Sequence, residues 1–134
     1  MRKTWNIRDK SAESAVREIL KSQARSRIYI FLLRKGKAKT EQIIKGSRLH
    51  PSTVRETLSK MYDQRLINRK KIRNDSIGKN PYLYYAIPPV KLLKRYAGEM
   101  EDRLNKLASL AISSDERKGN NIVRIKIYDK VDEA

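Results

Sequence analysis

The chain has 134 residues, a length typical of one domain, and its 32 Lys and Arg residues against 15 Asp and Glu residues give a formal net charge of +17. So large a positive excess indicates an anionic partner, either nucleic acid or an anionic membrane surface. The absence of Cys excludes disulfides, thiol catalysis and thiolate zinc sites. No apolar run approaches the roughly 18 residues of a membrane span, and the basic start lacks an apolar signal core, so we expect a cytoplasmic protein.

The first third of the chain predicts a short basic arm followed by two helices. Apolar residues between 11 and 20 recur at helical spacing, with Ser11 as the N-cap. A second helix begins after Ser22, ends at Gly36 and is apolar over most of its circumference, which predicts the central helix of the core. The apolar positions are Ala12, Ala15, Val16, Ile19 and Leu20 in the first helix, and Ile28, Ile30, Phe31, Leu32 and Leu33 in the second.

Residues 40–67 have the pattern of two helices joined by a short turn. The first runs from Thr40 to Lys45, and residues 46–50 form the turn. Pro51 suits the first position of the next helix, because its missing N–H would be unpaired there. The residues of this helix that should pack inward are Val54, Leu58 and Met61, with Leu66 and Ile67 closing its end.

A basic hairpin is predicted over residues 67–87. Residues 67–73 alternate in the manner of a strand, residues 74–81 are rich in turn formers, and residues 82–87 are rich in strand formers. We expect the hairpin tyrosines Tyr82, Tyr84 and Tyr85 to pack between the hairpin and the core rather than to stack on bases.

A long helix is predicted over residues 89–112, followed by a polar linker and a strand over residues 122–128. Its apolar residues are spaced alternately three and four apart over three heptads, as in a coiled coil. The spacing favours self-association of two such helices over packing on the same domain. The strand needs a partner, which either an N-terminal strand or a second subunit would supply. The predicted dimer interface consists of Val90, Leu93, Ala97, Met100, Leu104, Leu107 and Ala111.

Residues 22–88 resemble the winged helix-turn-helix domains of prokaryotic transcriptional regulators, most nearly the archaeal TrmB-like and ArsR-like kinds. The turn position that often holds Gly is Arg48 here, and the helix cap is His50 rather than Ser or Thr. The chain also lacks room for a TrmB-type sugar-binding domain and lacks the Cys or clustered His of ArsR-type metal sensors. The residues that carry the resemblance are Arg27–Leu33, Ile43, Leu49–Val54, Leu58, Met61, Leu66, Ile67 and Tyr84–Pro89.

The expected fold is α+β and mainly helical, a winged helix-turn-helix with an N-terminal helix, a long C-terminal dimerisation helix and a terminal strand. The expected division places an N-terminal arm and helix at 1–21, the DNA-binding domain at 22–88, the dimerisation helix at 89–112, and a linker with the strand at 113–134.

In such a fold, the second helix of the motif enters the major groove by its N-terminal part, and the basic hairpin follows the sugar-phosphate backbone. The residues expected at base edges are Ser52, Thr53, Arg55 and Glu56. Those expected at the backbone are Ser59, Lys60, Arg69, Lys70, Lys71, Arg73 and Lys79. The alternative is that the serine and threonine cap the helix, that Arg55 and Glu56 are solvated, and that the hairpin cations discourage aggregation.

These features predict a homodimeric, sequence-specific regulator that binds double-stranded DNA and is associated with the nucleoid. Two alternatives remain open: an architectural DNA-binding protein without sequence choice, and a protein-interaction winged helix in a transcription or replication assembly. Neither a glycine-rich phosphate loop nor a nucleophile–base pair is present, so no enzymatic activity, cofactor or small-molecule ligand is expected. The lone histidine, His50, cannot build a metal site by itself.

Overall fold

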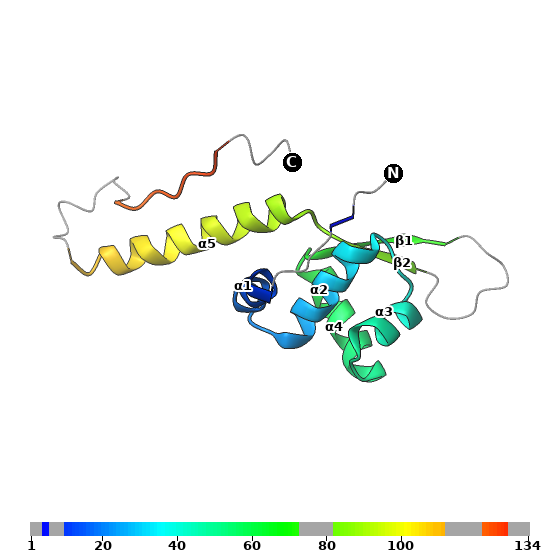
Figure 1. Ribbon diagram of the computed structural model, residues 1–134. Helices are drawn as coiled ribbons and strands as arrows, with labels where there is room; N and C mark the ends of the chain where they lie inside the picture. Colours follow the sequence, from blue (N-terminus) through cyan, green and yellow to red (C-terminus); the bar gives the residue numbers. More distant parts are fainter. Residues whose placement is uncertain (1–3, 6–9, 73–81, 112–121, 129–134) are drawn as a thin grey trace. The chain divides into compact units, whose positions relative to one another are not determined.

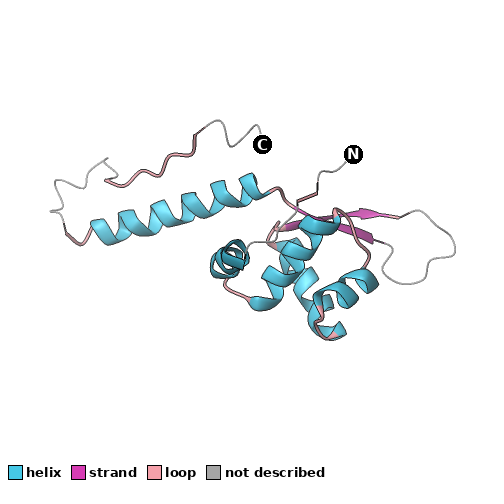
Figure 2. Ribbon diagram, viewed as in Figure 1, coloured by secondary structure: helices cyan, strands magenta, loops and turns pink. Residues whose placement is uncertain are grey.

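The computed structural model describes residues 4–5, 10–72, 82–111 and 122–128, and the chain divides into two compact units, residues 1–87 and 88–134 (Figure 1). The architecture is the expected mainly helical α+β fold with a two-stranded wing and a long C-terminal helix (Figure 2). The first unit contains α1 (Lys10–Leu20), α2 (Gln23–Lys35), α3 (Thr40–Ser47), α4 (Pro51–Asp63), β1 (Ile67–Lys71) and β2 (Tyr82–Ala86). The second unit contains α5 (Pro89–Ala108).

Helix α2 is the central helix of the first unit, as its apolar circumference predicts. Its N-terminus is capped by Ser22, whose side chain accepts a hydrogen bond from the Arg25 backbone N–H at 3.2 Å. Its end is set by Gly36, which has a φ of 92°. Phe31 departs from the prediction, because its ring is only half-buried. The fully or nearly fully buried apolar residues of α2 are Ile28, Tyr29, Ile30, Leu32 and Leu33.

The turn between α3 and α4 is shorter than predicted. Helix α3 continues through Gly46 and Ser47, and the chain reverses over residues 48–50. Arg48, with a φ of 59°, takes the left-handed conformation in which glycine is more usual. Gly46 instead provides close packing, since a Cβ at this position would lie 2.0 Å from Cε1 of Phe31. The glycine two residues early is therefore explained by a neighbouring helix and not by the turn.

The hairpin is held to the helices at its base. Strands β1 and β2 pair antiparallel, and Ala38 adds a bridge to the outer edge of β2 through two backbone hydrogen bonds with Tyr84, of 3.0 and 2.8 Å. The buried Tyr29 hydroxyl of α2 donates to the Ile87 carbonyl at 2.8 Å. The Ile87 N–H donates in turn to the Leu66 carbonyl at 3.1 Å. The predicted hairpin tip, with Arg73 and Lys79, lies outside the described residues.

In the second unit, the expected terminal strand is absent from residues 122–128, which form no regular strand (Figure 1). Side chains of α5 take the place of a partner strand. The Asn105 amide oxygen accepts from the Val123 N–H at 2.8 Å, and its amide nitrogen donates to the Val123 carbonyl at 3.0 Å. The Glu101 carboxylate accepts from the Ile125 N–H at 2.8 Å. Polar side chains therefore satisfy these backbone groups without a partner strand.

The remaining boundaries differ little from those expected. Helix α1 begins at Lys10, so Ser11 lies inside the helix and is not its cap. Helix α5 ends at Ala108, four residues before the predicted 112. Within the described part of the chain, no helix combines the length and the apolar character that crossing a bilayer requires.

The two helical glycines provide a matched test of the packing between α2 and α3. Gly46→Ala should lower the free energy of unfolding by about 1 kcal/mol. The new methyl group forces the Phe31 ring to move, and the free energy that this costs exceeds the gain in helix propensity. Gly98→Ala, whose Cβ would meet nothing within 4 Å, should raise helix stability by about 0.5–1 kcal/mol. Urea denaturation followed by circular dichroism measures both. Equal stabilisation by the two alanines would contradict the packing role of Gly46.

Candidate nucleic-acid interface

The N-terminus of α4 is built to present its first turn to the exterior. Pro51 occupies the first helical position, and His50 is the N-cap in extended conformation. The His50 Nδ1 atom accepts from the Ser52 backbone N–H at 3.3 Å and lies 2.8 Å from the Ser52 hydroxyl. The opposite face of the helix is fixed in the core, because Val54, Leu58 and Met61 are almost completely buried, as predicted.

The residues predicted to contact bases and phosphates on α4 lie mainly on its exposed side. Thr53 is half-buried, and Arg55 makes no ion pair among the described residues. Glu56 and Lys60 form an exposed ion pair of 3.0 Å across one helical turn. Such a pair contributes only about 0.3–0.5 kcal/mol, so it leaves both side chains free to exchange partners. The exposed members of the set are Ser52, Arg55, Glu56, Ser59 and Lys60.

The exposed face of α4 has mixed charge. With 3.6 residues per turn, its midline passes through Ser52, Glu56, Ser59 and Asp63, while the cations lie on its flanks. A helix with this face cannot attract a polyanion by itself. Attraction to phosphate therefore has to come from the neighbouring elements.

Arg69 of β1 links α4 to the hairpin. Its guanidinium carbon lies 4.0 Å from the centre of the Tyr62 ring of α4 and 4.3 Å from that of the Tyr82 ring of β2. Partial desolvation lowers the pKa of Arg69, but the hydrogen bond with Tyr84 and the nearby phenol groups outweigh it and raise the pKa, so the cation is retained. We infer that Arg69, predicted as a phosphate contact, mainly positions the hairpin against α4.

Of the three tyrosines of β2, Tyr84 is buried as predicted. Tyr84 is 7% exposed, and its ring centre lies 6.3 Å from that of Tyr82, with the two ring planes tilted by 58°. Tyr82 stacks on Arg69 and Tyr85 is half-buried. Tyr84 therefore belongs to the core, whereas Tyr82 and Tyr85 are partly covered.

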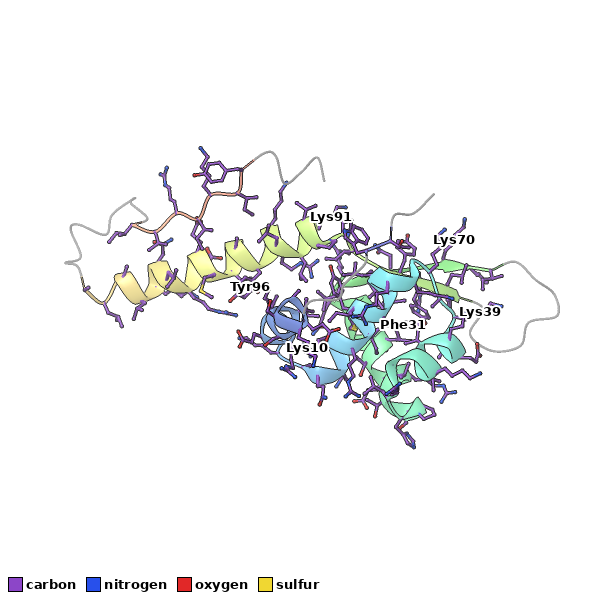
Figure 3. All side chains as sticks on the ribbon, in the orientation of Figure 1. Lys10, Phe31, Lys39, Lys70, Lys91 and Tyr96 are labelled. Atoms are coloured by element: carbon purple, nitrogen blue, oxygen red, sulfur yellow. The ribbon has the colours of Figure 1, made fainter. Side chains whose placement is uncertain are left out.

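Besides Arg69, Lys70 and Lys71 are exposed cations of β1. Figure 3 labels Lys70, and the alternation of the strand points the two lysines to opposite faces. The structure adds two cations that sequence reasoning missed. Lys37 and Lys39 are exposed and flank Ala38, which is bridged to β2. Lys39 is labelled in Figure 3. Positive charge therefore borders the hairpin on the β1 side and on the β2 side. The basic loop before α3 was the available signal, but its position beside the hairpin depends on the long-range Ala38–Tyr84 pairing.

The predicted dimer stripe on α5 is partly open to solvent. Leu93 is 39% exposed and Leu107 is 64% exposed, while Ala97 is buried and Ala111 is exposed. The half-buried members are Val90, Met100 and Leu104.

As for metals, the described residues contain no group of three or more His, Asp or Glu side chains that could hold an ion.

Arg69 and Lys70 are adjacent and exposed, yet they should affect stability differently. Arg69→Met should lower the free energy of unfolding by about 1 kcal/mol, because it removes two cation–π contacts. Lys70→Met should change it by less than about 0.5 kcal/mol. Urea midpoints measured on the full chain compare the two variants. If Arg69→Met is as harmless as Lys70→Met, the stacked rings do not hold the hairpin.

Two solved structures are similar to this chain. A possible transcriptional regulator from Methanosarcina mazei is 16% identical, with a TM-score of 0.61 over 84% of this chain and 98% of that chain. A MarR-family transcriptional regulator from Silicibacter pomeroyi is 17% identical, with a TM-score of 0.47 over 81% of this chain and 74% of that chain. At such low identity the first likeness shows the winged-helix fold alone. No curated protein matches the sequence.

The family model of the TFIIE alpha subunit matches residues 10–111, which include every helix and strand from α1 to α5. This is a transcription factor family and not an enzyme family. The resemblance of residues 22–88 to winged helix-turn-helix regulators thus predicted the fold correctly. The family that matches, however, is neither TrmB-like nor ArsR-like. The chain belongs to the TFIIE alpha subunit family.

Proposed function

We propose that this chain is a transcription factor that binds double-stranded DNA with α4 and its wing, as a homodimer. The observation that carries the proposal is the joint placement of α4 and the cationic hairpin. The stacking of Arg69 between Tyr62 and Tyr82 ties the two elements together, while the buried face of α4 leaves its polar face outward. The resemblance of residues 22–88 to TrmB-like and ArsR-like DNA-binding domains supports the same reading. The proposed location is the cytoplasm, in association with the nucleoid.

The proposed division of roles follows from chemistry and exposure. Arg55 forms no ion pair with the part of the chain that the structure describes and can donate two hydrogen bonds to a guanine edge, whereas Glu56 can accept from the cytosine amino group. The proposed base contacts are Ser52, Thr53, Arg55 and Glu56. The proposed phosphate contacts are Ser59, Lys60, Arg69, Lys70, Lys71, Arg73 and Lys79, with Lys37 and Lys39 added from the structure.

The proposed dimer forms through the α5 stripe. The segment 122–128 bonds to Glu101 and Asn105, which lie on a neighbouring face of α5, and the exposed Leu93 and Leu107 remain available to a second α5. Two winged helices joined in this way would contact half-sites about one helical turn apart on a pseudo-palindrome.

A second candidate role is binding to another protein of a transcription assembly. It is favoured by the family match together with Glu56 and Asp63 on the midline of α4, since carboxylates there repel phosphate. In this role α4 would contact a protein surface, and the cations of the wing would select a partner with an acidic surface.

Removing the wing cations tests DNA binding directly. For six to ten phosphate contacts, affinity for a short duplex should fall by about three to five orders of magnitude between 50 and 200 mM salt. Lys70→Gln with Lys71→Gln should weaken binding and reduce the slope of the log–log salt plot by about 2. Lys91→Gln with Lys106→Gln removes the same charge from exposed positions of α5 and should leave the slope nearly unchanged. Fluorescence anisotropy measures both.

The same titrations separate the alternatives. A flat salt dependence would reject DNA as the partner, and unchanged affinity for both Arg55→Gln and the double wing variant would favour the protein-binding role. Equal competition by a genomic fragment selected for binding and by random DNA would indicate architectural binding without sequence choice.

The dimer prediction is tested by Leu104→Glu. A charge placed in the half-buried stripe should dissociate the dimer, so the sedimentation mass should fall from twice 15.7 kDa to 15.7 kDa at micromolar concentration. Leu110→Glu is the control, because Leu110 is 82% exposed and lies outside the repeat. A monomeric parent protein, or a Leu104→Glu variant that still dimerises, would contradict an interface on α5.

A further inference from the structure

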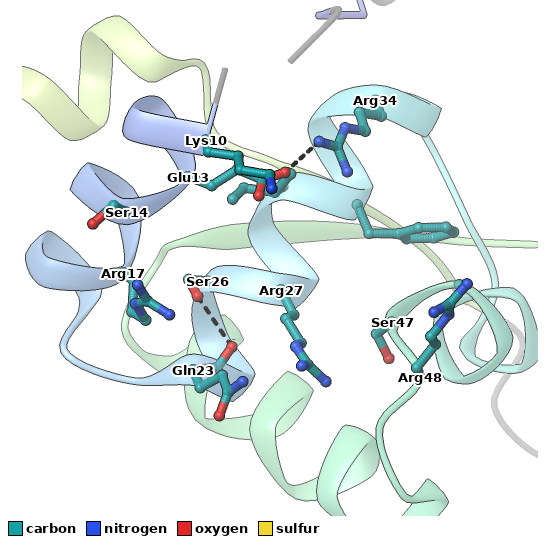
Figure 4. Close-up of a pocket in the computed structure, with 13 residues that line it drawn as sticks. Lys10, Glu13, Ser14, Arg17, Gln23, Ser26, Arg27, Arg34, Ser47 and Arg48 are labelled. Atoms are coloured by element: carbon teal, nitrogen blue, oxygen red, sulfur yellow. Dashed lines mark hydrogen bonds and ion pairs between the residues drawn. The ribbon is translucent and has the colours of Figure 1, made fainter. Parts of the chain in front are cut away.

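The first unit contains a cleft that the proposed DNA interface does not use. It measures about 480 Å³ and lies between α1, α2 and the end of α3 (Figure 4). Its apolar lining comes from Ile30 and the half-buried ring of Phe31. None of the described α4 or hairpin residues assigned to DNA lines it. The charged residues that line it are Lys10, Glu13, Arg17, Arg27, Arg34 and Arg48.

The cleft has a surplus of positive charge. Its one acid, Glu13, is paired with Arg34 at 2.5 Å. The exposed side chains of Lys10, Arg17, Arg27 and Arg48 form no ion pair among the described residues. Four cations are thus held around an apolar surface without local compensation.

The spacing of these cations indicates the size of the occupant. Lys10 and Arg17 are seven residues apart on α1, which corresponds to about 10.5 Å along the helix axis. Arg48 adds a cation from the turn after α3. A single phosphate or carboxylate group cannot reach cations spread over this length. Several carboxylates on one face of a helix, at positions i, i+3 or i+4 and i+7, have the same span.

The apolar lining distinguishes a peptide from a nucleic acid. Because Gly46 has no Cβ, the Phe31 ring packs against α3 and presents its remaining surface to the cleft. A duplex backbone offers phosphates but no apolar side chain to cover this ring. An amphipathic helix offers both, with an apolar side chain on one stripe and carboxylates beside it.

We propose that this cleft binds an acidic amphipathic helix of a partner protein. An apolar side chain of that helix packs on Phe31 and Ile30, and its carboxylates pair with Arg17, Arg27 and Arg48. The site uses different residues from the proposed DNA interface, because its lining comes from α1, α2, the end of α3 and Arg48. The mode of recognition is a helix in a groove, with electrostatic selection of acidic sequences.

The probe is a 15-residue synthetic helix with a Leu and Phe stripe flanked by Glu at every third or fourth position, labelled for fluorescence anisotropy with the full-length chain. We expect it to bind, and a scrambled peptide of the same composition to bind at least tenfold more weakly. Arg17→Gln with Arg27→Gln should weaken binding about fivefold to thirtyfold, since two charge pairs are lost at exposed positions. The matched variant Lys91→Gln with Lys106→Gln should weaken it less than twofold.

Two results would overturn the proposal. One is equal binding of the ordered and scrambled peptides, or equal binding by the parent and the Arg17→Gln, Arg27→Gln variant. The other comes from a parallel titration with a 20-base-pair duplex: if the cleft variant loses affinity for the duplex and not for the peptide, the cleft is part of a nucleic-acid surface. The second variant is Phe31→Leu, because Phe31 supports α3 and a larger truncation would disturb the fold. It should weaken peptide binding further, and circular dichroism should show that the fold is retained.

Discussion

The burial of α2 is the constraint on which the rest of the first unit depends. Its side chains of Ile28, Tyr29 and Leu32 are at most 1% exposed, and α1, α3, α4 and β2 all contact this helix. Tyr29 adds direction to this burial, because its hydroxyl donates to the Ile87 carbonyl at the end of the hairpin. A buried polar group that loses its partner costs about 1–3 kcal/mol, so this bond selects one position of the hairpin on the helix.

The same contacts also fix the position of the candidate interface. Tyr29 fixes the end of β2, Ala38 pairs with its middle, and Arg69 stacks between the hairpin and α4. The cations of the wing and the polar face of α4 are consequently set by the core and not by their own contacts. This explains how an α4 face of mixed charge can belong to a strongly basic protein: α4 supplies shape and hydrogen-bonding groups, and its neighbours supply charge.

The sequence predicted the elements well where the signal was local. The 3.6-residue spacing identified α2 and α4, and Pro51 marked the start of α4 correctly. The roles of Gly46 and Arg69 could not be predicted, because each depends on a residue from another element, Phe31 in one case and Tyr62 in the other. The strand predicted over residues 122–128 was wrong for the same reason. Its alternation is strand-like, yet side chains of α5 replace the missing strand.

The cleft and the proposed DNA interface meet at one short turn. Arg48 lines the cleft, while His50, two residues later, caps α4 and bonds to Ser52. Arg48 holds a left-handed conformation, so a cleft ligand that alters its backbone would also alter the start of α4. Linkage requires that such coupling be reciprocal: a partner helix that changes DNA affinity by some factor must have its own affinity changed by DNA by the same factor. Two surfaces that are separate in chemistry would then share one energetic connection through residues 47–52.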